Sequence, residues 1–202
     1  MNHTLLILNI IAITLCILLK ILYPKFRGYM GEFWVKLELK KLHNKEYYVL
    51  NDVMIEDDCG THQIDHLVIS KYGIFVIEMK NYYGLITGDE YKDKWVQHLG
   101  RNKYYFTNPI HQNYGHVKCL EKLLKLENEF FIPIICFSNS AKLRIKSKSQ
   151  VVNLDYLTDA IKKFYKPLLN NNIEEIINVI NKNNILDKEK RKQHVKGIKN
   201  KE

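Results

Sequence analysis

Residues 62–81 read HQIDHLVISKYGIFVIEMKN, and this stretch decides the fold. Two runs rich in β-branched residues flank the link Lys71-Tyr72-Gly73, whose glycine tolerates a positive φ. The pattern predicts a β-hairpin of strands 62–70 and 74–81. Because side chains alternate along a strand, Glu78 and Lys80 are expected on one face, with Asp65 of the first strand nearby.

Two carboxylates and a lysine on one sheet surface predict a cation site, since charges in apolar strands need compensation. Mg²⁺, or Mn²⁺ in its place, prefers the oxygen ligands that Asp65 and Glu78 offer. Such a metal polarises a phosphate oxygen and lowers the pKa of a bound water. Lys80 could orient that water or offset charge in the transition state. The alternative is a set of solvated charges near strand ends, a common arrangement.

A helix is predicted just upstream, over residues 28–43 (GYMGEFWVKLELKKLH). Glu32, Val35, Leu39 and Leu42 recur at spacings of three and four, so Glu32 shares a stripe with apolar residues. A carboxylate on such a stripe must be paired or bind a cation. Glu32 is therefore a candidate for a second metal or for a metal-bound water.

The remaining elements complete a mixed α/β sheet flanked by helices. A strand over 46–56 precedes the hairpin, residues 82–107 read as irregular, and Asn108-Pro109 begins a helix that runs to about Glu127. The further expected elements are a buried strand at 130–137, a short strand near Val151, and helices at 155–165 and 173–185.

The combined segments resemble the nuclease-related domain (NERD) family over about residues 28–165. The matching features are Gly31-Glu32 with its helical stripe, Q63-I-D-H66, G73-I-F-V-I-E-M-K-N81, Gly84, Gly88, Trp95, N108-P-I-H-Q-N113, F137-S-N-S-A141 and V151-V-N-L154.

That family is similar to the PD-(D/E)XK restriction-endonuclease-like superfamily, which implies an α-β-β-β-α-β core. The resemblance implies Asp65, Glu78 and Lys80 as the central triad, Glu32 as a helix-borne acid, and Gln63 and Gln112 as accessory residues. It also implies a nuclease dependent on Mg²⁺ or Mn²⁺, with DNA expected before RNA.

Residues 4–23 (TLLILNIIAITLCILLKILY) predict a transmembrane helix, because about 20 apolar residues span a bilayer core. Lys20 lies near the end of this segment and Lys25 and Arg27 follow it, and the positive-inside rule then places the domain in the cytoplasm. A cleaved signal peptide and a buried core helix are the alternatives. The former lacks a positive first segment and a cleavage site.

The net charge of +9 lies mainly in two basic flanks, the cations after the apolar run and the tail 188–202. The tail is expected to be unstructured and could contact nucleic acid or anionic lipid, or be a solvated end. Four segments follow: an anchor and basic flank (1–27), the NERD domain (28–165), an amphipathic helix (166–187) and the tail. The four cysteines show no zinc spacing and are expected to be reduced, mostly buried thiols.

Several aromatic and imidazole side chains leave two interpretations open. His62 and His66 flank Asp65 and could ligate a metal, or they are strand surface groups. Trp95, Tyr104 and Tyr105 could stack on bases or pack in the core. For the whole chain, a nuclease, a catalytically silent nucleic-acid-binding module and a membrane-associated interaction protein all remain, and a homodimer is possible.

Overall fold

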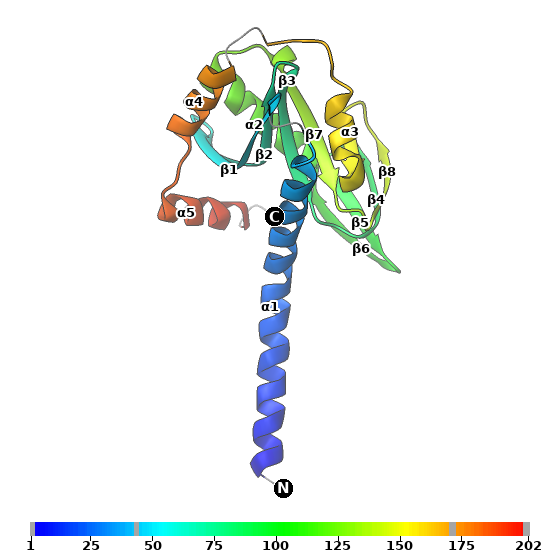
Figure 1. The fold of residues 1–202 in the computed structure, drawn as a ribbon. Coiled ribbons are helices and arrows are strands. Elements are labelled where there is room, and N and C mark those ends of the chain that lie inside the picture. The colour runs from blue at the N-terminus through cyan, green and yellow to red at the C-terminus, as the bar shows by residue number, and fades with distance from the viewer. Residues whose placement is uncertain (1–2, 43–44, 170–172, 200–202) are drawn as a thin grey trace.

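The computed structural model describes residues 3–42, 45–169 and 173–199. Figure 1 shows a mixed α/β fold, in which two mixed sheets are flanked by helices and one long helix projects from the domain. This architecture confirms the α/β sheet flanked by helices that the sequence predicts.

The projecting helix α1 (His3–Leu39) joins the two expected N-terminal helices into one element that continues through Pro24. Its last turns reach the domain, where Val35 and Leu39 are buried against the first sheet. The helix is thus both a stalk and one of the layers of the fold.

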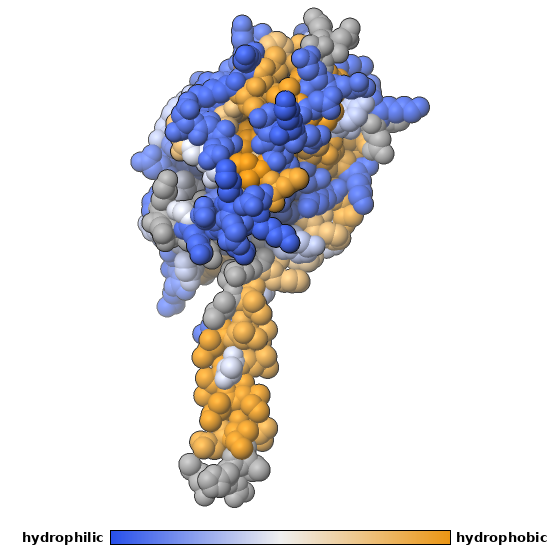
Figure 2. Space-filling view, turned by 90° about the vertical axis from the view of Figure 1, so that its left-hand side faces the viewer, coloured by the Kyte–Doolittle hydropathy of each residue, from blue (hydrophilic) through white to orange (hydrophobic). Residues whose placement is uncertain are grey.

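The predicted transmembrane helix at residues 4–23 is not supported. Among the helices of the described residues, none is long and apolar enough to cross a membrane. The α1 stretch 6–19 carries no charged side chain. Its leucine and isoleucine side chains are exposed and form the apolar stalk of Figure 2.

The first sheet has the strand order β1-β2-β3-β7-β9. Its strands are β1 (Tyr47–Asp57), β2 (Gly60–Ser70), β3 (Gly73–Lys80), β7 (Phe131–Phe137) and β9 (Gln150–Asn153). β1, β2 and β3 are antiparallel neighbours, whereas β7 pairs in parallel with β3 and β9. The predicted β2–β3 hairpin is confirmed, and Gly73 in its turn has a φ of 134°.

Helices cover both faces of this sheet. On one face, α2 (Pro109–Leu124) and α4 (Ile173–Asn183) bury a cluster that includes Leu67, Val76 and Leu120. On the other face, α1 and α3 (Leu157–Lys162) bury Phe75 and Ile77. Two short 3-10 helices, η1 (Asn128–Phe130) and η2 (Leu154–Tyr156), precede β7 and α3.

A second sheet, in the order β6-β5-β4-β8, occupies the stretch for which no regular structure is predicted. Its strands are β4 (Gly84–Asp89), β5 (Lys94–Leu99), β6 (Asn102–Thr107) and β8 (Ala141–Lys146). The irregular assignment of 82–107 is therefore wrong. Trp95 is fully buried on the inner face of this sheet, stacked on Phe137 with 6.2 Å between ring centroids.

The basic tail was expected to be unstructured, but it forms α5 (Lys188–Lys199). Arg191 holds it to the domain, because its guanidinium donates to the Asp52 carboxylate at 2.7 Å and to the carbonyl oxygen of Ile185 at 2.7 Å. Charge-assisted hydrogen bonds of this kind attach a helix whose own surface is strongly polar.

Candidate active site

The site forms where β2 and β3 separate. Their printed pairing runs from Ser70↔Gly73 to His66↔Ile77, and Asp65 and Glu78 lie just beyond the last pair. There the Asp65 carboxylate oxygen Oδ2 accepts a hydrogen bond from the backbone N–H of Met79 at 2.7 Å. The Asp65 carboxylate thus replaces the main-chain carbonyl acceptor that β2 no longer supplies once it separates from β3. A buried N–H group needs such a partner.

Glu78 is buried, with 3% of its surface exposed, and forms an ion pair with Lys80. Glu78 Oε1 lies 2.8 Å from Lys80 Nζ, as expected of residues two apart on a strand. Lys80 Nζ also donates to Gln112 Oε1 of α2 at 2.9 Å. Although burial opposes ionisation, Lys80 and the neighbouring His116 lower the pKa of Glu78 to about 2.

Asp65 has the opposite tendency. Burial and the negative charge of Glu78 raise the pKa of Asp65 well above its usual range, against the Met79 hydrogen bond and Lys80. For Lys80, burial favours the neutral amine, but the Glu78 carboxylate outweighs it and raises the pKa. The two acids therefore compete for one nearby cation, and Glu78 retains the negative charge.

Glu32 approaches this pair from α1. The helix passes so close to β3 that a Cβ on Gly31 would lie 2.8 Å from the Cβ of Asn81. Burial, then the charges of Asp52 and Glu78, raise the pKa of Glu32. The structure therefore brings Glu32 within electrostatic reach of Glu78, and the glycine before it permits that approach.

The two glutamines have different surroundings. Gln112 contacts Lys80, as described above, and so belongs to the site. Gln63 instead donates to Asp52 Oδ1 at 2.8 Å, on a residue of β1 whose φ is 55°. The Gln63 side chain therefore holds the distorted strand β1 beside the site and does not face Lys80.

Unpartnered polar atoms lie beside Glu78. Its second oxygen, Oε2, is buried and has no hydrogen-bond partner among the described residues. His116 Nε2 lies 3.3 Å from it without hydrogen-bond geometry, and both ring nitrogens of His116 are also buried without a hydrogen-bond partner in the described part of the chain. Buried polar groups without partners point to a missing ion or water. Mg²⁺ commonly uses one or two carboxylates and keeps several waters, so the donor set of Asp65 and Glu78 fits it.

Glu32 does not complete a tight cage with these two acids. Within the described part of the chain, no three-donor group includes Glu32, Asp65 or Glu78. A metal at this place would therefore be held by few protein ligands.

His116 was not predicted as part of the site. It lies one helical turn after Gln112, and residues four apart share a helix face. That spacing is the signal that would have found it, given Gln112. The histidines next to Asp65 differ: His66 is fully buried, with Nδ1 2.7 Å from Asn51 Oδ1, whereas His62 is half-buried and contacts Asp57.

The second sheet presents a basic outer face. The paired residues Leu85↔His98, Leu85↔Lys142, His98↔Lys103 and Thr87↔Arg144 align side chains across four strands. The exposed cations of this outer basic face are Lys94, Lys103, Lys142, Arg144 and Lys146. Tyr105, 65% exposed, pairs with Val96 in the same sheet. Of the three aromatic residues weighed for base stacking, Trp95 packs in the core, whereas Tyr104 and Tyr105 are exposed.

The chain belongs to the nuclease-related domain (NERD) family, which it matches over residues 27–138. This confirms the resemblance seen in the sequence. It is also 38% identical to an uncharacterized protein of Bacillus anthracis, over 97% of this chain and 95% of that protein.

A solved structure also matches in part. It is the crystal structure of a protein of unknown function, AF1548, with a TM-score of 0.36 and 13% sequence identity, covering 62% of this chain and 59% of that chain. At this level of similarity it carries no argument about fold or activity.

Proposed function

We propose that this protein is a metal-dependent nuclease that hydrolyses phosphodiester bonds, with DNA as its substrate. The observation that carries the proposal is the meeting of Asp65, Glu78 and Lys80 where β2 and β3 separate, with Glu78 Oε2 buried and without a hydrogen-bond partner among residues 3–42, 45–169 and 173–199. Within the NERD family we further propose a restriction-endonuclease-like core built from α1, β1, β2, β3, α2 and β7.

The residues would divide the chemistry as follows. Asp65 and Glu78 would hold Mg²⁺ or Mn²⁺, which when bound supplies Lewis-acid polarisation and a water of lowered pKa. Lys80 carries a positive charge beside Glu78 and offsets negative charge that develops on the phosphate. Gln112 holds the Lys80 ammonium in place through its Oε1. Glu32 adds a further acid at the edge of the site.

The outer basic face supports a nucleic-acid substrate. Its cations repeat along β8 at Lys142, Arg144 and Lys146, and alternate positions on a strand point to the same face. Rows of cations neutralise a phosphate backbone. The same face also suits the second candidate function, a module that binds nucleic acid without cutting it.

One experiment separates these two functions. The full-length chain in detergent is incubated with linear, supercoiled and single-stranded DNA and with RNA, in Mg²⁺, Mn²⁺ or EDTA. We expect metal-dependent cleavage that Asp65→Asn abolishes and that Asp159→Asn, at an exposed position of α3, leaves intact. Binding of DNA without cleavage under every condition would favour the silent module instead.

We also propose that the protein associates with the cytoplasmic face of a membrane through the exposed apolar side chains of α1. The apolar surface in Figure 2 and the basic residues that follow it support this. Cell fractionation tests it: the protein should sediment with membranes, and removal of residues 3–22 should release it. Equal sedimentation of both forms would contradict the proposal.

A further inference from the structure

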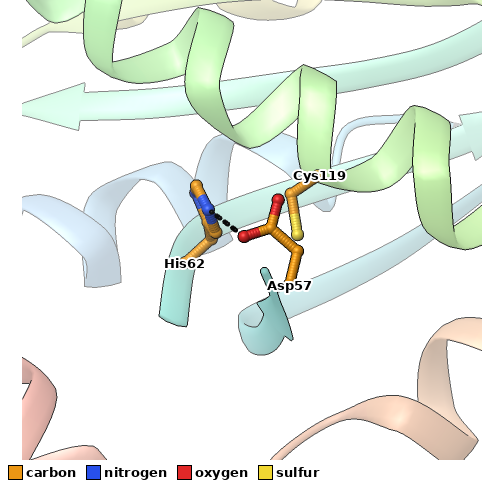
Figure 3. A group of neighbouring side chains, drawn as sticks. All are labelled: Asp57, His62 and Cys119. Carbon is orange, nitrogen blue, oxygen red and sulfur yellow. Dashed lines mark hydrogen bonds and ion pairs between the residues drawn. The ribbon is translucent and has the colours of Figure 1, made fainter. Parts of the chain in front are cut away.

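A second cluster of metal-ligating side chains lies apart from the Glu78–Lys80 pair. Asp57 ends β1, His62 lies near the start of β2, and Cys119 faces them from α2 (Figure 3). One ligand atom from each of the three lies within 4.8 Å of the others, and His62 Nε2 is 3.3 Å from Asp57 Oδ1. Asp57 and His62 are partly buried and Cys119 is buried.

We propose that Asp57, His62 and Cys119 form a transition-metal site of the zinc class. Thiolate and imidazole donors select such ions and disfavour Mg²⁺. In a tetrahedral zinc site, neighbouring ligand atoms are about 3.3–3.8 Å apart, given metal–ligand bonds of about 2.0–2.3 Å. The distance between the ligand atoms of Asp57 and His62 already falls in that range. Small side-chain movements would bring the other distances between ligand atoms into it. A water would complete the tetrahedron.

The protonation states of Cys119 and His62 determine which proton must leave when a metal ion binds. Burial, then the charge of Asp57, raise the pKa of Cys119 to about 12, so the metal-free protein carries a thiol there. Metal binding forms the metal–sulfur bond and releases the thiol proton to solvent. Burial and His116 lower the pKa of His62, which leaves a neutral imidazole with a free lone pair.

A purely structural role explains only some of the contacts around the Asp57 carboxylate. Its Oδ1 accepts from the backbone N–H of Cys59 at 2.8 Å and its Oδ2 lies 3.6 Å from Lys122 Nζ, so it stabilises the β1–β2 turn. These contacts give no reason for a buried thiol to face a carboxylate. The Lys122 side chain is 55% exposed and can turn away to solvent when a cation binds.

His116 provides an independent observation beside the cluster. Its ring stands edge-on to His62, with centroids 5.7 Å apart and an interplanar angle of 84°. Its two ring nitrogens are buried between His62 and Glu78 and have no hydrogen-bond partner within the residues that the structure describes. An ion that fixes His62 would therefore also fix the ring that contacts Glu78.

Cobalt spectroscopy of the full-length chain tests this site. The protein is freed of metal with a chelator and titrated with Co²⁺, whose complexes with thiolate show a sulfur-to-metal charge-transfer band and strong tetrahedral visible bands. We expect saturation at one equivalent and displacement by Zn²⁺. Cys119→Ser should remove the charge-transfer band. His62→Gln should weaken Co²⁺ binding beyond the roughly 10–100-fold that losing an outer-shell partner costs.

Matched variants make the result specific. Cys136→Ser, at a buried thiol elsewhere in the core, and Cys59→Ser, in the adjacent turn, should both keep the band. Asp65→Asn should also keep it, which separates this site from the proposed nuclease centre. Circular dichroism confirms that each variant is folded, and half-buried His62 offers a test if Cys119→Ser does not fold. Absence of the band in the folded wild type, or its persistence in Cys119→Ser, would overturn the proposal.

Discussion

The Asp65 carboxylate accepts the backbone N–H of Met79 at 2.7 Å, directly beside the buried Glu78. This one hydrogen bond connects the fold to the site. It gives the Met79 N–H an acceptor where the β2–β3 pairing ends. It also holds Asp65 next to Glu78, where burial and the repulsion between the two carboxylates raise the pKa of Asp65. The repulsion is a cost to stability that a cation would remove.

Asp65→Asn should stabilise the metal-free protein. The amide oxygen can still accept from Met79, while the charge that opposes Glu78 is gone. We expect the free energy of unfolding in EDTA to rise by about 1 kcal/mol. The increase in melting temperature that Mg²⁺ gives the wild type should shrink in the variant, because a ligand of the native state stabilises only if it binds. Thermal melts with and without Mg²⁺ measure both effects, and a lower melting temperature in EDTA would contradict this account.

Removing Lys80 should be costly unless Glu78 is removed with it. Lys80→Met leaves Glu78 buried without its ion-pair partner, a situation that costs about 3–5 kcal/mol. The double variant Glu78→Gln/Lys80→Met buries no charge at either position and should recover most of that loss. Chemical denaturation of the wild type, both single variants and the double variant gives the coupling energy. Additive losses would show that the two side chains do not stabilise each other.

The sequence predicts the strands of the candidate site well, for a physical reason. Alternation fixes which side chains of β3 share a face, and the short turn limits the register of the hairpin, so the sequence predicts Asp65, Glu78 and Lys80 close together. β4, β5 and β6 escaped prediction because each has only six residues and the outer face mixes apolar Leu85 and Val96 with His98. Such short half-exposed strands do not show a clear apolar alternation.

The cluster of Asp57, His62 and Cys119 could not be found from spacing. Asp57 and His62 are close in the chain, but Cys119 reaches them only because α2 packs across the β1–β2 hairpin. The cysteines were expected to be mostly buried, yet Cys16 and Cys59 are exposed, and the buried Cys119 is the one beside possible ligands. Contacts of this kind depend on helix placement on a sheet, which local sequence patterns do not encode.

Acid should destabilise the protein partly through His66. Burial lowers its pKa from 6.5 to about 4, so the unfolded chain binds a proton on this residue before the folded protein does. The free energy of unfolding should therefore fall as the pH decreases from 6.5 to 4, by up to about 3 kcal/mol at about 1.36 kcal/mol per pKa unit. His66→Gln should flatten this decline.

The measurement is denaturation in EDTA across that pH range, so that no metal contributes. His111→Gln, on the exposed surface of α2, is the matched control. An equal decline in the wild type and in His66→Gln would assign the acid sensitivity to other groups.

Gly88 should not tolerate a side chain. A Cβ there would lie 2.3 Å from Trp95 Cδ2, and the Trp95 ring is fully buried. Gly88→Ala must displace that ring from Phe137, and overpacking of this kind costs about 1–3 kcal/mol. Gly28→Ala, on α1 with nothing within 4 Å, should instead stabilise by up to about 1 kcal/mol. Urea unfolding compares the two, and equal effects would mean that the close approach at Gly88 is relieved without cost.

The outer basic face should contribute to nucleic-acid affinity rather than to the chemical step. The double variant Lys142→Ala/Arg144→Ala removes two exposed cations that lie two residues apart on the same face of β8. It leaves Glu78 and Lys80 unchanged. Each lost phosphate contact should lower the slope of log Kd against log salt by about 0.9. Fluorescence anisotropy with labelled DNA at several salt concentrations measures this slope, and single-turnover cleavage at saturating DNA should be unchanged. Lys162→Ala/Lys163→Ala, at exposed positions next to one another at the end of α3, is the charge-matched control. If both double variants change the slope equally, the attraction comes from the total charge of the protein and not from this face.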